Sequence, residues 1–215
     1  GEVIEERPVN VDRAAIEAAC ARYTGVISQT PPMHSALKHE GKALYEYARA
    51  GVEVEREPRR VTIHAIDIVD GDDDRWTIDV RCSKGTYIRT LAEDIGRALG
   101  CGAHLAALRR TGSGTLTLDL AVTLEALEAM SEAERDARLL DADALIADCP
   151  AVRLDAENAA RFLSGMRRRL ELADADCVRV FGPEPKAFLG AGHIAAGELI
   201  STRLLSPIDQ AALSR

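Results

Sequence analysis

The chain has 215 residues, of which 47% are hydrophobic and 29% charged, and its formal net charge is −8 at pH 7. This length and balance are typical of a globular protein with one or two domains and a sizeable core. No apolar run approaches the roughly 20 residues that a spanning helix requires, so the sequence excludes a helical membrane protein and we expect a cytoplasmic one.

The opening GEVIEE has a strand-like pattern, and its first residue is Gly, not Met. A chain that begins inside a β pattern is either a trimmed product or a piece of a longer protein. We therefore expect that this chain is part of something longer.

A helix is predicted for residues 10 to 24, where apolar residues recur at helical spacing and Asn10 or Asp12 is the cap. Two consecutive prolines cannot continue a helix or enter a central strand, so residues 28 to 35 should form a loop. A short helix is expected within residues 41 to 51. Its surroundings mix aromatic rings with cations, the combination that grips nucleic acid, although burial explains one of the two tyrosines better than RNA contact does. The side chains concerned are His34, Lys38, His39, Lys42, Tyr45, Tyr47 and Arg49.

Strands are predicted for residues 52 to 56 and 59 to 69 and, after a polar turn at 71 to 74, for residues 76 to 82. Apolar and polar residues alternate strictly in the last of these, which indicates a strand with one buried face. The apolar parity shifts within residues 63 to 66, and this shift predicts a β-bulge.

A helix should follow this strand, because apolar residues recur at helical spacing over residues 88 to 99 and Gly100 and Gly102 end the pattern. Its cap is either Thr86 or Thr90, and Thr90 would form a capping box with Glu93. Polar and basic residues fill the turn between strand and helix, where the unpaired N–H groups of a helix N-terminus can face an anion. We expect the functional site at this turn.

Further along, a strand is predicted for residues 116 to 120 and one or two helices for residues 123 to 148. Short β segments surround one helix at residues 155 to 163, so residues 151 to 215 should form a small β-rich module. Its basic run, residues 167 to 169, fits a solvated turn and a phosphate clamp equally well.

Charge is unevenly distributed along the chain. Residues 81 to 110 carry six basic and two acidic residues, residues 61 to 80 six aspartates and one arginine, and residues 111 to 150 nine acids and two arginines. A basic island in an acidic protein indicates a polyanionic partner, from which the acidic segments should face away. By charge alone, an ordinary solvated helix face explains the island about as well.

The five cysteines are scattered without any CxxC pair. No secretory signal is recognisable, and cytoplasmic proteins keep their thiols reduced. We therefore expect free thiols, with no disulfide and no zinc site. The five are Cys20, Cys82, Cys101, Cys149 and Cys177.

The run CSKGTYIRTLAEDIGRALGCGAHLAALRR, residues 82 to 110, resembles the motif of TruB-type tRNA pseudouridine synthases, bacterial isomerases that act on uridine 55 of the tRNA T loop. PPMHSALKHEGKALYEYARAG, residues 31 to 51, is similar to the RNA-gripping insertion of that family. GEVIEERPV resembles the segment that follows the first half of the family's catalytic domain. The resemblance covers residues 1 to 125 well and the remainder loosely.

The resemblance implies an α+β fold, with a mixed sheet, flanking helices and a mobile thumb insertion at about residues 25 to 51. It implies a catalytic part over residues 1 to 122, a helical connector over 123 to 150 and a PUA-like RNA-binding domain over 151 to 215. The implied partner is the T arm of tRNA. We expect a monomer that needs no cofactor, metal or membrane.

Three residues match functional positions of the family. Tyr87 matches the tyrosine that contacts the flipped uridine, Arg89 the arginine that pairs with the catalytic aspartate, and Leu108 the apolar pocket wall. The chemistry agrees, because a flipped base needs an aromatic or apolar wall and a guanidinium keeps a nucleophilic carboxylate ionised and oriented. The implied catalytic residues are Tyr87 and Arg89, and the implied substrate-binding residues are Tyr87 and Leu108. RNA binding is expected from Met33, His34, Lys38, Lys42, Arg49, Lys84, Arg109 and Arg110.

The family's nucleophilic aspartate lies in a GxxDPxATGxLP-type motif, which does not occur in residues 1 to 215. We therefore expect the C-terminal portion of a synthase, inactive on its own. One alternative is a non-catalytic protein that binds or folds tRNA on the same scaffold. Another is an acidic interaction module whose basic island binds a different anion.

Overall fold

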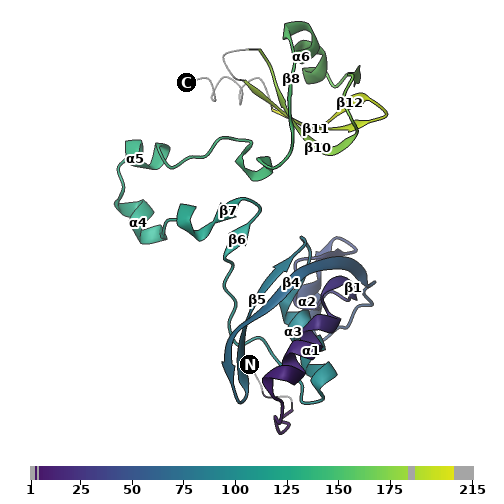
Figure 1. The fold of residues 1–215 in the computed structure, drawn as a ribbon, viewed down its shortest axis with the longest axis vertical. Coiled ribbons are helices and arrows are strands. Elements are labelled where there is room, and N and C mark those ends of the chain that lie inside the picture. The colour runs from purple at the N-terminus through teal and green to yellow at the C-terminus, as the bar shows by residue number, and fades with distance from the viewer. Residues whose placement is uncertain (1–2, 4, 184–186, 206–215) are drawn as a thin grey trace. The chain divides into compact units, whose positions relative to one another are not determined.

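The structure, a computed structural model, describes residues 3, 5 to 183 and 187 to 205. The chain divides into two compact units, residues 1 to 108 and residues 109 to 215 (Figure 1). Each unit combines helices with a sheet, which confirms the predicted α+β class. The boundaries expected at residues 122 and 150 stay predictions.

A three-stranded antiparallel sheet is the frame of the first unit. Its order is β1 (Gly25–Gln29), β4 (Arg59–Asp72) and β5 (Arg75–Cys82), so β4 lies in the middle. The ladder between β4 and β5 shifts register between Ile63 and Ala65, which confirms the predicted bulge. Half-buried and exposed residues alternate along β5, as its sequence predicts.

One loop prediction and one strand prediction near this sheet are wrong. Residues 28 and 29 belong to β1, which pairs with residues 59 to 63, so the predicted loop begins only at residue 30. Residues 52 to 56 form no strand, because the Arg56 guanidinium, and not a neighbouring strand, donates to the Val54 carbonyl at 3.1 Å.

Helix α1 (Arg13–Arg22) lies within the predicted range of residues 10 to 24 and is shorter at both ends. The carboxylate of Asp12 accepts the N–H of Ala15 at 2.8 Å, so Asp12 and not Asn10 is the cap. Before it, the described residues of the strand-like opening have no regular structure, and residues 1, 2 and 4 lie outside the described part.

Helices α1 and α3 (Ile88–Leu99) pack together over the sheet and bury one apolar core. Ile63 in β4 and Leu91 in α3 are fully buried. Burying a side chain of this size contributes about 1.5 to 3 kcal/mol, so these contacts fix α3 against the sheet. The core contains Ile16, Ala19, Cys20, Ile63, Leu91 and Ile95.

Gly96 lets the chain fold back along α3. A Cβ at this position would collide with the backbone of Gly102 and Ala103, and the Gly96 carbonyl accepts the N–H of Gly102 at 2.9 Å. Gly100, at φ 84°, ends the helix as its position predicts.

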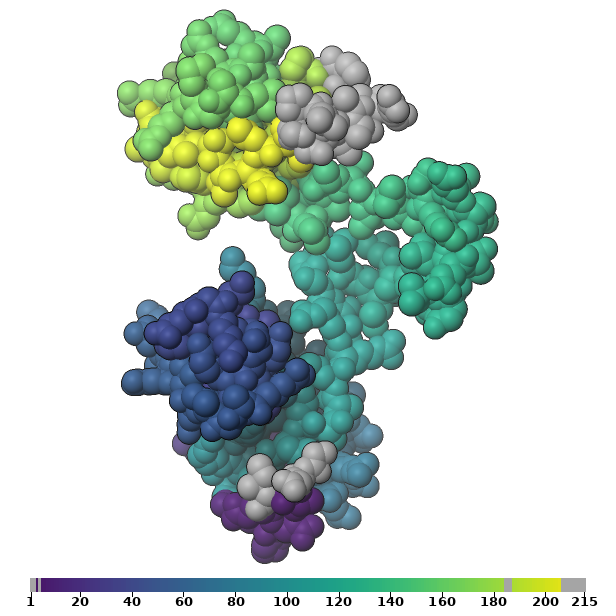
Figure 2. Space-filling view, turned by 180° about the vertical axis from the view of Figure 1, so that it is seen from behind, coloured from purple at the N-terminus to yellow at the C-terminus, as the bar shows by residue number. Residues whose placement is uncertain are grey.

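The insertion, residues 30 to 58, connects β1 to β4. It contains the hairpin of β2 (Lys38–His39) and β3 (Lys42–Ala43), followed by α2 (Leu44–Arg49), which confirms the short helix expected here. In Figure 2 the residues around 30 to 50, in dark blue, form one face of the first unit.

The second unit begins with short elements. The strand predicted for residues 116 to 120 stops at Thr117, because residues 118 to 120 form a 3₁₀ helix. The Ala121 N–H closes this helix by donating to the Leu118 carbonyl at 3.0 Å. The helices predicted after it exist, but they are short. The elements are β6 (Gly112–Ser113), β7 (Leu116–Thr117), η1 (Leu118–Leu120), α4 (Leu124–Ala129), α5 (Glu132–Asp136) and η2 (Ala144–Ile146).

A five-stranded sheet with one helix completes the second unit, which confirms the predicted β-rich module. The strand order is β8-β10-β11-β12-β9, and Phe162 of the helix is fully buried against the sheet. The last strand, β12, was not predicted. The elements are β8 (Ala151–Arg153), α6 (Ala156–Leu163), β9 (Arg168–Arg169), β10 (Ala175–Phe181), β11 (Phe188–Ala195) and β12 (Glu198–Leu204).

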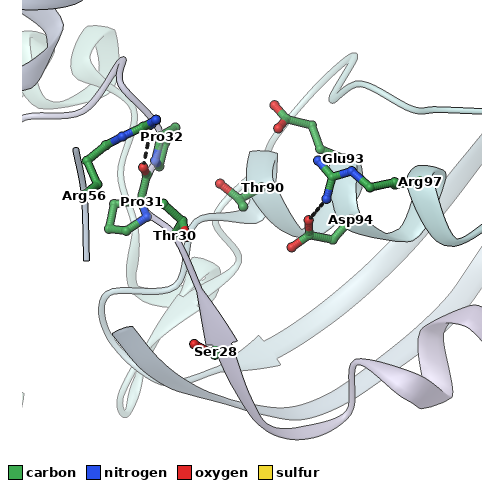
Figure 3. Close-up of a pocket in the computed structure, with 9 residues that line it drawn as sticks. All are labelled: Ser28, Thr30, Pro31, Pro32, Arg56, Thr90, Glu93, Asp94 and Arg97. Carbon is green, nitrogen blue, oxygen red and sulfur yellow. Dashed lines mark hydrogen bonds and ion pairs between the residues drawn. The ribbon is translucent and has the colours of Figure 1, made fainter. Parts of the chain in front are cut away.

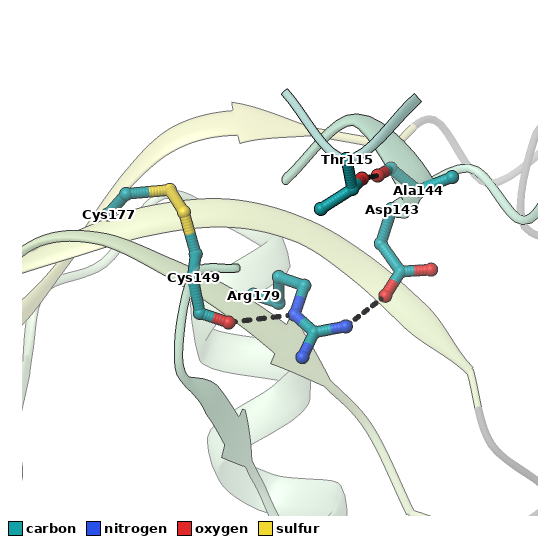
Figure 4. Close-up of polar contacts among 6 residues, drawn as sticks. All are labelled: Thr115, Asp143, Ala144, Cys149, Cys177 and Arg179. Atoms are coloured by element: carbon teal, nitrogen blue, oxygen red, sulfur yellow. Dashed lines mark hydrogen bonds and ion pairs between the residues drawn. A yellow bond between two sulfur atoms is a disulfide. The ribbon is translucent and has the colours of Figure 1, made fainter. Parts of the chain in front are cut away.

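Cys149 and Cys177 form a disulfide, so the expectation that all five thiols are free is wrong (Figure 4). They lie 28 residues apart in sequence, and the parallel pairing of β8 with β10 brings them together. Beside them, Arg179 donates to the Cys149 carbonyl at 2.9 Å and to the buried Asp143 carboxylate at 2.8 Å. The disulfide and this ion pair tie the segment before β8 to β10.

The other three cysteines are free. Cys20 lies in the apolar core, and burial raises the pKa of its thiol above the ordinary value. We expect it to be the least reactive of the three, because the thiolate is the nucleophile.

Replacing Cys177 with Ser should lower the unfolding free energy of the second unit by about 2 to 4 kcal/mol, because the disulfide restricts the unfolded chain. Urea unfolding followed by circular dichroism measures this change. The wild-type chain in reducing buffer should match the variant, and Cys101→Ser, at a free cysteine, should change little. Equal stability of Cys177→Ser and oxidised wild type would contradict the prediction.

Candidate nucleic-acid interface

Tyr87 stands where the polar turn becomes helix α3. Its backbone is extended, with φ −100° and ψ 106°, and the helix starts at Ile88. Both predicted caps are wrong. The Thr86 hydroxyl donates to the Ser83 carbonyl at 2.9 Å, and Thr90 lies inside the first turn. The boundary therefore depends on tertiary contacts and not on a local capping motif.

Gln29 supplies the contact that holds Tyr87. Its side-chain Oε1 accepts the Tyr87 N–H at 2.8 Å, and its Nε2 donates to the Tyr87 carbonyl at 3.1 Å. The residue is only 2% exposed, and a buried amide is stable only when its donor and acceptor are both paired. Gln29 was not predicted from the sequence, because a single glutamine inside a predicted loop gives no periodic signal.

Tyr87 and Arg89 flank the start of α3. Tyr87 is half-buried, and its hydroxyl makes no hydrogen bond within the described residues. Arg89 is exposed, and its Nη2 donates to the His34 carbonyl at 2.6 Å. Within the same part of the chain its guanidinium forms no ion pair with a carboxylate. Arg89 thus ties the first turn of α3 to the insertion while its other N–H groups keep donor capacity.

The two tyrosines of α2 are paired with cations. The Lys42 Nζ lies 4.8 Å from the Tyr47 ring centroid, and the Arg49 guanidinium carbon lies 5.3 Å from that of Tyr45. Tyr45 is exposed, so burial does not explain it, whereas Tyr47 is half-buried and its hydroxyl donates to the His39 carbonyl at 3.3 Å. The exposed Tyr45 ring with its adjacent cation offers both a stacking surface and a phosphate contact.

The other predicted site residues are distributed over the two units. Met33 is half-buried in the insertion, Lys38 is exposed on β2, and Lys84 is exposed in the turn before α3. Leu108 ends the first unit and is 65% exposed. Arg109 and Arg110 begin the second unit, and both are exposed. The structure thus joins the insertion to α3 through His34 and Arg89.

A pocket of about 360 Å³ lies between the insertion and α3 (Figure 3). Its arginines are engaged within the protein: Arg97 donates to Asp94 at 2.6 Å, and Arg56 donates to the Pro31 carbonyl at 3.1 Å. Both arginines thus have a partner within the protein, and two carboxylates share the lining of the pocket with them. The pocket is lined by Ser28, Thr30, Pro31, Pro32, Arg56, Thr90, Glu93, Asp94 and Arg97.

Glu93 and Asp94 lie in the second turn of α3, because the helix begins at Ile88. At this position the dipole of the helix N-terminus does not explain them. Asp94 instead pairs with Arg97, and its carbonyl accepts the Tyr23 hydroxyl at 2.9 Å. Asp94 therefore has a structural explanation that requires no catalytic role.

Acidic residues gather on β4, on β5 and in the turn that connects these strands. All six aspartates of residues 61 to 80 are exposed, which is consistent with a face turned toward solvent. In the described part of the chain, His, Cys, Asp and Glu side chains form no group of three or more that could hold a metal ion. None of the helices in that part is long and apolar enough to span a bilayer.

Three protein-family models match the chain. Residues 1 to 88 match the N-terminal domain of TruB family pseudouridylate synthases. Residues 89 to 147 match the C-terminal domain of tRNA pseudouridylate synthase B, and residues 150 to 205 match the C-terminal region of pseudouridine synthase II TruB.

Curated relatives carry the name tRNA pseudouridine synthase B. The protein of Cupriavidus pinatubonensis is 54% identical over 215 residues, which covers 95% of this chain and 68% of the relative. That of Ralstonia pickettii is 60% identical over 188 residues, 85% of this chain and 59% of the relative. The protein of Burkholderia mallei is 53% identical over 212 residues, which covers 95% of this chain and 70% of the relative. The chain thus spans about 59% to 70% of these relatives.

Two solved structures share the fold. A chain of a Cbf5–Nop10–Gar1 complex superposes with a TM-score of 0.71 at 20% identity, covering 95% of this chain and 65% of that chain. A chain of an H/ACA RNP bound to a substrate RNA containing 2′-deoxyuridine superposes with a TM-score of 0.67 at 18% identity, covering 94% of this chain and 63% of that chain.

Arg56→Ala should loosen the insertion, because the Arg56 guanidinium bonds the carbonyls of Val54 and Pro31 and its side chain is only 21% exposed. Charge-assisted hydrogen bonds of this kind contribute about 1.5 to 3 kcal/mol, so amide exchange in residues 31 to 43 should accelerate roughly tenfold or more. Hydrogen exchange with mass spectrometry measures the rates. The control is Arg60→Ala, an exposed arginine on β4. Unchanged exchange in Arg56→Ala would refute this anchoring role.

Proposed function

Because the chain belongs to the TruB family of pseudouridylate synthases, we propose that the protein isomerises uridine 55 in the T loop of tRNA to pseudouridine. The observation that carries the proposal is the pair formed by Tyr87 and Arg89 at the start of α3. One has a backbone held by a buried amide, and the other is an exposed guanidinium with no carboxylate partner in the described residues.

The reaction breaks the bond between uracil and its ribose and rejoins the base through carbon 5, so the uridine must first leave its stack. The half-buried ring of Tyr87 provides one wall for the flipped base, and Leu108 contributes an apolar wall. Arg89 holds the nucleophilic carboxylate ionised and oriented, since a guanidinium stabilises the charged form of a neighbouring carboxyl group.

The nucleophile comes from outside residues 1 to 215, because the sequence lacks the aspartate motif. Neither Glu93 nor Asp94 replaces it. Asp94 is paired with Arg97, and both acids lie one turn past Arg89, where the helix fixes their direction. The chain alone therefore binds substrate but does not turn it over.

RNA contact concentrates on the insertion and the turn before α3, because cations and aromatic rings occur together in the insertion. The insertion, with Met33 and His34, closes over the T loop. The acidic faces stay free of RNA. Phosphates are bound by Lys38, Lys42, Arg49, Lys84, Arg109 and Arg110.

The C-terminal module acts as a PUA-like RNA-binding domain. The enzyme works in the cytoplasm as a monomer without metal.

The test of the function is to incubate the full-length protein and the 215-residue chain separately with unmodified T-arm RNA and to count pseudouridine. The full-length protein should convert the RNA, and the short chain should be slower by at least about 10⁴-fold, the usual loss when a covalent catalyst is removed. Turnover by the short chain would identify a different nucleophile. RNA binding without turnover by the full-length protein would favour a tRNA-holding role.

Charge reversal of Arg109 and Arg110 to Glu should weaken T-arm binding and flatten its salt dependence, because each lost phosphate contact lowers the slope of log K against log salt by about 0.9. Fluorescence anisotropy at several salt concentrations measures both quantities. The matched control is Arg75→Glu, an exposed arginine within the acidic face. Intact binding in the variant with Arg109 and Arg110 reversed, together with a loss of binding on mutating residues 167 to 169, would move the site to the C-terminal module.

A further inference from the structure

The buried side chain of Gln29 forms hydrogen bonds with both the N–H and the carbonyl of Tyr87, a proposed site residue. Among the described residues of the first unit, no other buried side chain does this for a proposed site residue. Gln29 is the last residue of β1, and Tyr87 lies 58 positions away. We propose that Gln29 is a positioning residue for uridine isomerisation, which fixes the backbone of Tyr87 and thereby the direction of its ring. This inference rests on the proposed function.

The geometry of the contact supports this role. A side-chain amide that pairs with the N–H and the carbonyl of one residue imitates a strand partner, so it holds that residue extended. The direction of the Tyr87 Cα–Cβ bond is then set, because φ and ψ of the residue are set. The same carbonyl also accepts the Leu91 N–H at 3.0 Å and so opens the first helical hydrogen bond.

No local motif supplies the same control. The residue before a helix usually has a Ser, Thr, Asp or Asn side chain that caps the first turn, whereas Tyr87 makes no such bond. An apolar side chain at position 29 would fill the space, but it would leave the N–H of Tyr87 without its partner. The amide is therefore needed for its hydrogen bonds and not only for its volume.

The chain that leaves Gln29 reaches the second proposed site residue. Five residues later, the His34 carbonyl accepts the bond from Arg89. One short segment of the sheet edge and loop thus orients Tyr87 through a side chain and Arg89 through a carbonyl. A displacement of about 1 Å in such a site is enough to cost around 100-fold in rate.

The test uses the full-length protein with Gln29→Met, which keeps the volume but loses both hydrogen bonds, and Gln29→Glu, which keeps the acceptor for the Tyr87 N–H. Single-turnover formation of pseudouridine at saturating protein, the Kd for T-arm RNA and the Tm are measured. Gln29→Met should slow the single-turnover rate about 10- to 100-fold with Kd within about threefold of wild type. The single-turnover rate of Gln29→Glu should lie between those of the wild type and Gln29→Met.

Ile16→Val is the control for a purely structural role, because Ile16 lies in the same core and does not belong to the site. It should lower Tm and leave the rate unchanged. If Gln29→Met loses no more rate than this control, or if a weaker Kd accounts for the whole loss, the positioning role is overturned. If Gln29→Met does not fold, the test depends on Gln29→Glu, and a wild-type single-turnover rate in that variant overturns the positioning role. A wild-type protein that binds RNA but forms no pseudouridine would overturn the proposed function itself, and this inference with it.

Discussion

The antiparallel pairing of β1 with β4 is the constraint on which the first unit depends. It aligns residues 25 to 29 with residues 59 to 63, so the two ends of the insertion leave the sheet side by side. The same pairing brings Gln29, at the end of β1, against the start of α3. Helix α3 itself is fixed by burial of Leu91 and Ile95 beneath α1 and β4. Turn, helix and insertion therefore meet because a sheet and an apolar core bring them together.

In the second unit, a disulfide and an ion pair hold a segment with little core of its own against a sheet. The segment before β8 has few buried side chains, and many of its leucines are exposed. The disulfide at Cys149 and the buried pair of Asp143 with Arg179 join it to a β-sheet with a continuous core (Figure 4). A buried carboxylate of this kind is stable because the guanidinium partner offsets its desolvation.

Charge separates the surfaces that can meet RNA from those that cannot. Cations of the insertion lie over tyrosine rings, whereas the aspartates of β4, β5 and their connecting turn are exposed to solvent. A polyanion is attracted to the first surface and repelled by the second, and the effect weakens as salt screens the charges. This distribution is visible in the linear sequence, since each charged group occupies one continuous segment.

The sequence by itself determined the α+β class, the bulge in β4, helix α3 with its glycine stop and the positions of Tyr87 and Arg89. These features depend on periodicity, on glycine and on a long continuous motif, all of which are local. Only the tertiary structure decided the role of Gln29, the true start of α3, the anchoring by Arg56 and the disulfide between Cys149 and Cys177. Each of these is a contact between residues that stand far apart in the chain or at a boundary fixed by such a contact, and no local pattern specifies which distant donor will meet which acceptor.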